Sequence, residues 1–105
     1  MKTILPTELH AKLATGEKLQ LVDVREEWEF AKARIEGSVL IPMGEITRRL
    51  GEVDGESDIV VVCHHGGRSM QVALFLERQG FSKVHNLTGG VDAWARSVDP
   101  SMPIY

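Results

Sequence analysis

Short apolar runs alternate with segments of helical periodicity along the whole chain. The strongest run covers residues 59–62, four β-branched apolar residues in succession, which is typical of a strand buried on both faces of a sheet. Further strands are predicted at residues 19–24, 39–41 and 83–87 and, more weakly, at residues 2–5. Helices are predicted at residues 7–14, 26–33, 44–50, 69–79 and 91–98. This alternation predicts an α/β domain with a central, mostly parallel β-sheet.

The helix predicted at residues 69–79 has the clearest boundaries. Ser69 can cap its first turn, and Gly80 lies just beyond its end. Apolar residues occupy nearly every side of this helix. We therefore expect it to be deeply buried.

The chain of 105 residues has the size of one domain, which we place at residues 1–105. Its longest apolar run, residues 59–63, is too short to span a bilayer, and the first residues do not read as a signal peptide. We therefore expect a cytoplasmic protein. The net charge of −3 argues against a nucleic-acid or membrane-surface partner. The single cysteine excludes an internal disulfide and a metal site built from several thiolates.

The segment that follows residues 59–62 carries the candidate chemistry. Cys63 comes directly after the predicted strand, at the sheet edge where parallel α/β sheets place their sites. Gly66 and Gly67 can adopt positive φ angles that bring backbone N–H groups inward. The following helix adds free N–H groups and the positive end of its dipole. Because such surroundings favour the thiolate form of cysteine, the pattern predicts a reactive thiolate at Cys63.

Positive side chains accompany this cysteine. Arg68 is a permanent cation, and His64 and His65 can add partial charge. Asp and Glu are absent from residues 59–76. The local potential is therefore expected to be positive, which suits a small anionic substrate.

Two other interpretations of Cys63 stay open at this point. A lone cysteine after an apolar strand is often only a small buried hydrophobic residue. A metal site of Cys63, His64 and His65 is disfavoured, because adjacent residues on a tight turn rarely point at one ion and the sequence suggests no fourth ligand.

Three regions of the sequence form an ordered set of motifs. They are Leu21-Val22-Asp23-Val24-Arg25-Glu26 with Glu29-Phe30, Ile35-Glu36-Gly37-Ser38 and Ile41-Pro42; Cys63-His64-His65-Gly66-Gly67-Arg68-Ser69; and Asn86-Leu87-Thr88-Gly89-Gly90-Val91-Asp92-Ala93-Trp94. Together they resemble the rhodanese-type sulfurtransferases over nearly the whole chain. The resemblance implies a single rhodanese domain, in which helices flank both faces of the central sheet.

The sequence departs from the family pattern at one place. Where the family commonly carries Gly-His-Ile, this chain has Ala33-Arg34-Ile35. A role assigned to that histidine therefore does not carry over to this chain.

The length of the cysteine loop distinguishes two chemistries. The loop from Cys63 through Arg68 has six residues, which is the length found in the sulfurtransferases that the chain resembles. The related cell-cycle dual-specificity phosphatases carry one more residue before their arginine. A phosphate or arsenate centre has more oxygens around the attacked atom than one outer sulfur has. The shorter loop therefore favours sulfur transfer over phosphoryl transfer or arsenate reduction.

The resemblance implies a two-step covalent reaction that needs no metal or organic cofactor. The Cys63 thiolate takes a sulfane sulfur from thiosulfate or a similar small anionic donor, and cyanide or a thiol, including a thiol on a protein, then removes it. The alternative is a persulfide carrier or interaction module with little turnover on its own. Cys63 is expected to be the nucleophile, and Arg68 to bind the donor's sulfonate. The expected substrate-binding residues are His64, His65, Gly66, Gly67, Ser69 and Arg25.

Structural roles are expected for the other charged residues. Asp23 is expected in an ion pair or as a hydrogen-bond anchor. The charge run of Glu26, Glu27 and Glu29 is expected on a solvated helix face.

Overall fold

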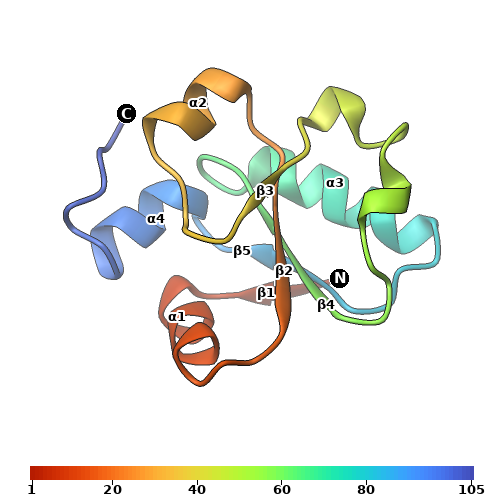
Figure 1. The fold of residues 1–105 in the computed structure, drawn as a ribbon, viewed down its shortest axis with the longest axis horizontal. Coiled ribbons are helices and arrows are strands. Elements are labelled where there is room, and N and C mark those ends of the chain that lie inside the picture. The colour runs from red at the N-terminus through yellow and green to blue at the C-terminus, as the bar shows by residue number, and fades with distance from the viewer.

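The computed structural model describes all 105 residues and contains one five-stranded sheet in the order β1-β5-β4-β2-β3. Every neighbouring pair of strands is parallel. The predicted parallel α/β fold is therefore confirmed, and the weakest predicted strand is present as β1 (Figure 1). The strands are β1 (Lys2–Ile4), β2 (Leu19–Asp23), β3 (Val39–Leu40), β4 (Asp58–Val62) and β5 (Val84–Leu87).

Helices cover both faces of the sheet, as expected. Alternate residues of β4 feed two separate apolar clusters, because successive side chains of a strand point to opposite faces. Val60 and Val62 pack with residues of α1 (Pro6–Ala14) and α4 (Gly90–Ser97). Ile59 and Val61 pack with residues of α3 (Gly67–Arg78) on the other face. The short helix α2 (Glu27–Lys32) follows β2 (Figure 1).

The prediction of a helix at residues 44–50 is wrong. Two separate 3₁₀ turns occupy this region, η1 (Met43–Glu45) and η2 (Leu50–Glu52). Gly44 and Gly51 lie in these turns, and glycine weakens an α-helix through its backbone entropy. A stretch this short does not sustain an α-helix against that cost.

The start and the burial of α3 also differ from the prediction. The helix begins at Gly67, and its cap is Gly66 with φ +107°, not Ser69. Met70 and Leu74 remain 42% and 40% exposed, so only one side of this helix is buried. A glycine cap places Ser69 inside the first turn, where its side chain is available for other contacts.

The parallel sheet gathers the loops after its strands at one edge. Asp23 is in register with Val62, so the residues after β2 and β4 start side by side.

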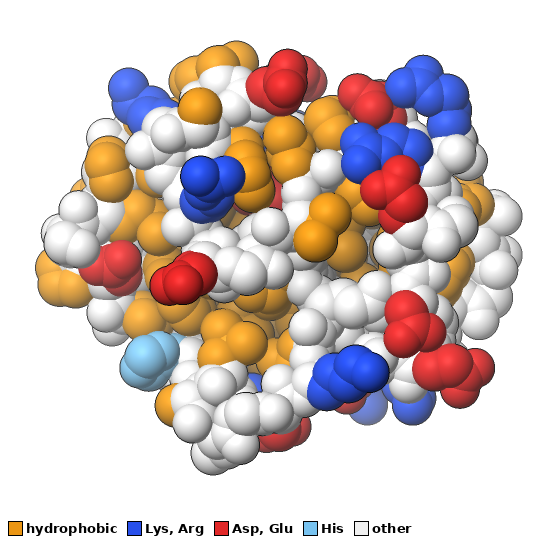
Figure 2. All heavy atoms as spheres, viewed as in Figure 1, with side chains coloured by type: hydrophobic (Ala, Val, Ile, Leu, Met, Phe, Trp, Pro, Cys, Tyr) orange, Lys and Arg blue, Asp and Glu red, His pale blue; other side chains and the backbone are white.

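On the face in Figure 2, acidic and basic side chains are interspersed around apolar atoms. None of the helices has the length and apolar character needed to cross a membrane.

Candidate active site

Cys63 lies immediately after β4, the strand between β2 and β5. The residue is only 1% exposed. Its Sγ accepts a hydrogen bond from the backbone N–H of Gly66 at 3.0 Å and lies 3.2 Å from the hydroxyl of Ser69. The loop after Cys63 therefore turns back on the sulfur, and Gly66, with φ +107°, directs its amide inward as predicted, whereas Gly67 has no positive φ.

Asn86 holds this loop in place from β5. Its Nδ2 donates to the carbonyl oxygen of Gly66 at 3.2 Å, and its Oδ1 accepts from the hydroxyl of Ser69. Ser69 and Asn86 are both buried. In the sequence Asn86 stands out only as part of a motif, and its place near the carboxyl end of a predicted strand is the signal that could have identified it.

The first turn of α3, which follows the loop directly, has further free N–H groups. Met70 N–H bonds to the Gly66 carbonyl at 3.1 Å, which leaves the amides of Gly67, Arg68 and Ser69 without a helical acceptor. Together with the dipole of this 12-residue helix, they favour negative charge near its start.

The start of α4 fixes the other side of the loop. Val91 N–H donates to the carbonyl of Cys63 at 2.8 Å, and Asp92 N–H donates to that of His64 at 3.0 Å. This approach requires a glycine at position 90, where φ is +60° and a Cβ atom would lie 2.5 Å from the His64 carbonyl oxygen. Gly90 thus permits close packing of the start of α4 against the cysteine loop.

Arg68 is not a free cation. Its Nη1 and Nη2 donate to the two carboxylate oxygens of Glu29 at 2.7 and 2.8 Å. Glu29 is only 3% exposed, so its expected place on a solvated face is wrong. The Arg68 hydrogen bonds lower the pKa of Glu29 to about 2. The absence of acidic residues near Cys63 in the sequence therefore did not predict the local charge, because α2 brings a carboxylate there.

Arg25 does not line the candidate site, contrary to expectation. Its side chain is fully buried and forms an ion pair with Asp23, with Nη2–Oδ2 at 2.7 Å. Other guanidinium hydrogen bonds go to the carbonyls of Glu29 and Ala33 and to the hydroxyl of Tyr105. Every Arg25 nitrogen is engaged inside the protein, so the residue is structural, while the expected ion pair of Asp23 is present.

His64 and His65 lie at the surface side of the loop. The His64 ring stacks on the Tyr105 ring, with centroids 3.9 Å apart. The His65 ring is tilted by 31° against His64, with centroids 3.8 Å apart. Burial, with a smaller effect of the His65 charge, lowers the pKa of His64. His65 is exposed. Tyr105 was not predicted to be near this loop; its hydroxyl also donates to Glu29 at 2.9 Å.

The chain is similar to a recognised family over most of its length. A model of the rhodanese-like domain matches residues 5–97. The putative sulfurtransferase YtwF of Bacillus subtilis is 38% identical, with 95% of this chain and 96% of that protein covered. The thiosulfate sulfurtransferase GlpE of Pseudomonas aeruginosa is 39% identical, with coverage of 78% and 74%. The crystal structure of a rhodanese-like domain protein from Staphylococcus aureus has a TM-score of 0.86 and 35% identity, with 100% and 99% covered.

Some similar proteins are much longer. The chain spans 38% of the rhodanese-like/PpiC domain-containing protein 12 of Arabidopsis thaliana, at 41% identity over all of this chain. It spans 45% of the putative sulfur carrier protein YrkF of Bacillus subtilis, at 41% identity over 79% of this chain. The same kind of domain is thus found alone and as part of larger proteins.

Proposed function

The chain belongs to the rhodanese-like family of sulfurtransferases, and we propose that it moves a sulfane sulfur from thiosulfate to cyanide or a thiol through a persulfide on Cys63. The observation that carries this proposal is the position of the Cys63 sulfur. It lies at the start of α3, 3.0 Å from the Gly66 amide and 3.2 Å from the Ser69 hydroxyl. Such a ring of donors stabilises negative charge on sulfur.

The first step makes the persulfide. The Cys63 thiolate attacks the outer sulfur of thiosulfate, and a new S–S bond forms. The original S–S bond of the donor breaks, and its electron pair leaves with sulfite. The negative charge that remains on the outer sulfur of Cys63 is stabilised by the free amides of Gly67, Arg68 and Ser69.

The second step returns the thiolate. Cyanide attacks the outer sulfur, thiocyanate forms, and the electron pair of the persulfide bond returns to the Cys63 sulfur. A thiolate acceptor follows the same course and leaves as its own persulfide. The donor and the acceptor supply every atom and electron pair in the two steps, so the proposed reaction uses no cofactor.

Arg68 has a different role in this proposal from the one expected. Because both of its Nη groups bind Glu29, it is first a positioning residue that ties the cysteine loop to α2. The exposed part of its side chain, 37% of the whole, stays available to attract a dianionic donor. His65, on the same loop, is also exposed.

The choice of thiosulfate as donor is supported by two observations. The similar thiosulfate sulfurtransferase GlpE is 39% identical to the chain. The six-residue loop from Cys63 to Arg68 suits one sulfur better than a phosphate or arsenate centre. Inserting one residue between Cys63 and Arg68 should lower thiosulfate turnover and favour phosphoryl or arsenate substrates. Unchanged thiosulfate turnover in that variant would refute the argument from loop size.

A kinetic matrix of donors and acceptors tests the proposal. With thiosulfate and cyanide, sulfite and thiocyanate should form in equal amounts, and the Cys63→Ser protein should form neither. Turnover of phosphoryl substrates without sulfite release would contradict sulfur transfer.

A persulfide carrier is the second candidate function. The similarity to a putative sulfur carrier protein supports it. In that case Cys63 is loaded with sulfur, but cyanide turnover is negligible and a protein acceptor raises the rate. Fast turnover with thiosulfate and cyanide alone would exclude this alternative.

A further inference from the structure

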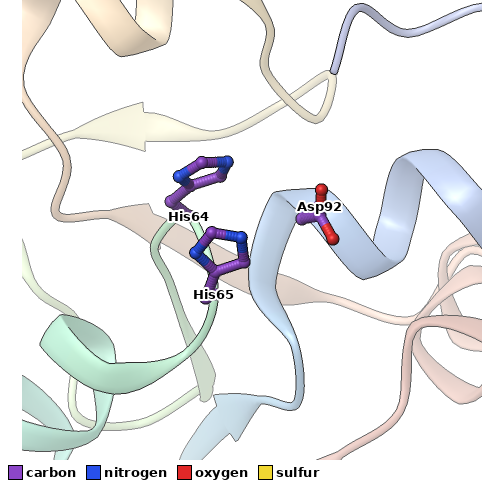
Figure 3. Close-up of side chains that lie close together, drawn as sticks. All are labelled: His64, His65 and Asp92. Atoms are coloured by element: carbon purple, nitrogen blue, oxygen red, sulfur yellow. The ribbon is translucent and has the colours of Figure 1, made fainter. Parts of the chain in front are cut away.

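Two histidines and one carboxylate meet beside the cysteine loop. The ligand atoms of His64, His65 and Asp92 all lie within 4.8 Å of one another, and Figure 3 shows the two rings one above the other with Asp92 alongside, at the start of α4. The metal site considered from the sequence combined Cys63 with these two histidines and did not include Asp92. The carboxylate comes from a helix that begins 25 positions after His65 in the sequence numbering.

The backbone fixes this arrangement. Asp92 N–H donates to the His64 carbonyl at 3.0 Å, so the backbones of Asp92 and His64 are held next to each other. The Tyr105 ring stacks on His64 with an angle of 5° between the planes, which restricts rotation of that imidazole. The His64 ring, oriented in this way, loses little freedom when it binds a metal ion.

One nitrogen in this cluster has no partner. The Nε2 atom of His64 is buried and makes no hydrogen bond. An unpartnered buried polar atom normally costs free energy. A metal ion would give this imidazole the partner that the protein does not supply.

We propose that His64, His65 and Asp92 bind a divalent transition-metal ion of the zinc class. Two imidazoles and one carboxylate are a donor set that zinc uses readily, and they leave a fourth position for water. With metal–ligand bonds of about 2.0–2.2 Å, ligand atoms in a tetrahedral site lie about 3.4 Å apart. The cluster therefore has to contract slightly.

The side chains that must move are free to do so. His65 is exposed, and its ring can rotate at little cost. Asp92 is held by one ion pair to Arg96 at 3.0 Å, and the Arg96 side chain is 62% exposed. Such a surface ion pair contributes little stability, so a metal ion competes with it easily. The Cys63 sulfur is not part of this site, because it faces Gly66 and Ser69.

Zinc titration by calorimetry tests the site, and it should be done on the Cys63→Ser protein so that the thiol cannot bind metal. One zinc ion per chain should bind. His65→Ala and Asp92→Asn, each in that background, should weaken binding at least about tenfold. The matched control is His85→Ala, which removes a histidine paired with Asp58 at 3.1 Å in another part of the molecule. It should leave the affinity unchanged. Thermal unfolding verifies that each variant is folded.

The zinc affinities of these variants distinguish the proposed site from zinc binding elsewhere on the protein. Equal affinity in the Cys63→Ser parent and in both ligand variants would overturn the proposal, and so would loss of binding in Cys63→Ser itself. Cobalt, used as a second probe, should give the visible spectrum of a nitrogen and oxygen site without thiolate charge transfer.

A consequence for activity rests on the proposed function. A metal ion at His64 and His65 would stand beside Cys63, so zinc should slow sulfur transfer in the wild-type protein and less so in Asp92→Asn. Zinc binding without any sulfur transfer would refute the proposed function alone. Sulfur transfer without zinc binding would refute only the metal site.

Discussion

The guanidinium of Arg68 binds the carboxylate of Glu29 through two parallel hydrogen bonds, at 2.7 and 2.8 Å, across 39 positions of the sequence. This ion pair connects the cysteine loop to α2. Tyr105 adds a third hydrogen bond to the same carboxylate. Bidentate, partly buried pairs of this kind are stronger than ordinary surface ion pairs.

The Glu29 pair predicts a pH-dependent stability. Its pKa is lowered from 4.5 to about 2 by the Arg68 hydrogen bonds first, against the opposing effect of burial. The folded state favours the ionised form of Glu29 more than the unfolded state does. The stabilisation by this ion pair is therefore fully present above pH 4.5. It should be lost as the pH falls toward 2. The shift corresponds to about 3 kcal/mol in the free energy of unfolding.

Urea denaturation at a series of pH values measures this effect. Glu29→Gln should lower the free energy of unfolding at pH 7 and flatten its decline in acid. Glu27→Gln, on the same helix but exposed, should change neither. An equal acid profile for wild type and Glu29→Gln would contradict the role of the pair.

Ser69 should contribute to both stability and sulfur transfer. Ser69→Ala removes the hydroxyl next to the Cys63 sulfur and leaves Asn86 Oδ1 without its donor. We expect a loss of about 1–3 kcal/mol in stability and a fall of about 10–100-fold in the rate of persulfide formation. Stopped-flow measurement of sulfite release gives the rate. The control Ser97→Ala removes an exposed hydroxyl and should leave both quantities unchanged; an equally fast Ser69→Ala protein would contradict this role.

Gly90 should not tolerate a side chain. A Cβ atom there would collide with the carbonyl oxygens of Cys63 and His64, at a positive φ angle. Gly90→Ala should therefore cost about 2–5 kcal/mol in stability and displace the cysteine loop. Gly67→Ala is the control, because its Cβ would meet nothing within 4 Å. Thermal unfolding compares the two, and similar melting temperatures would show that the close approach is unimportant.

Arg25 should act through stability and not through substrate binding. Arg25→Lys keeps the charge but leaves several buried acceptors unpaired, so we expect a loss of about 1–3 kcal/mol in stability. The KM for thiosulfate should not change in the folded protein. Arg34→Lys, on an exposed arginine, is the control. A raised KM with unchanged stability would place Arg25 at the substrate instead.

The sheet was predictable because its signals are local. Residues 59–62 have an unbroken apolar pattern, and they form β4 in the middle of the sheet. Cys63 could be placed at the sheet edge for the same reason. The segment at residues 44–50 carried a weak helical pattern between glycines, and in the protein it breaks into two 3₁₀ turns.

The partners within the candidate site were not predictable, because they are set by the tertiary fold. Nothing near Arg68 in the sequence identifies Glu29 as its partner, and nothing near His64 identifies Tyr105 as its stacking neighbour. The charge pattern of α2 indicated a solvated face, whereas Glu29 is buried on it. Ser69 has a side chain suited to capping, but the positive φ of Gly66 makes the glycine the cap.

Intact-protein mass spectrometry after incubation with thiosulfate tests persulfide formation most directly. The wild-type chain should gain the mass of one sulfur atom, cyanide should remove it, and the Cys63→Ser chain should gain nothing. An unchanged mass of the wild-type chain with thiosulfate and other sulfane donors would contradict sulfur transfer through Cys63, as would a gain that persists in Cys63→Ser.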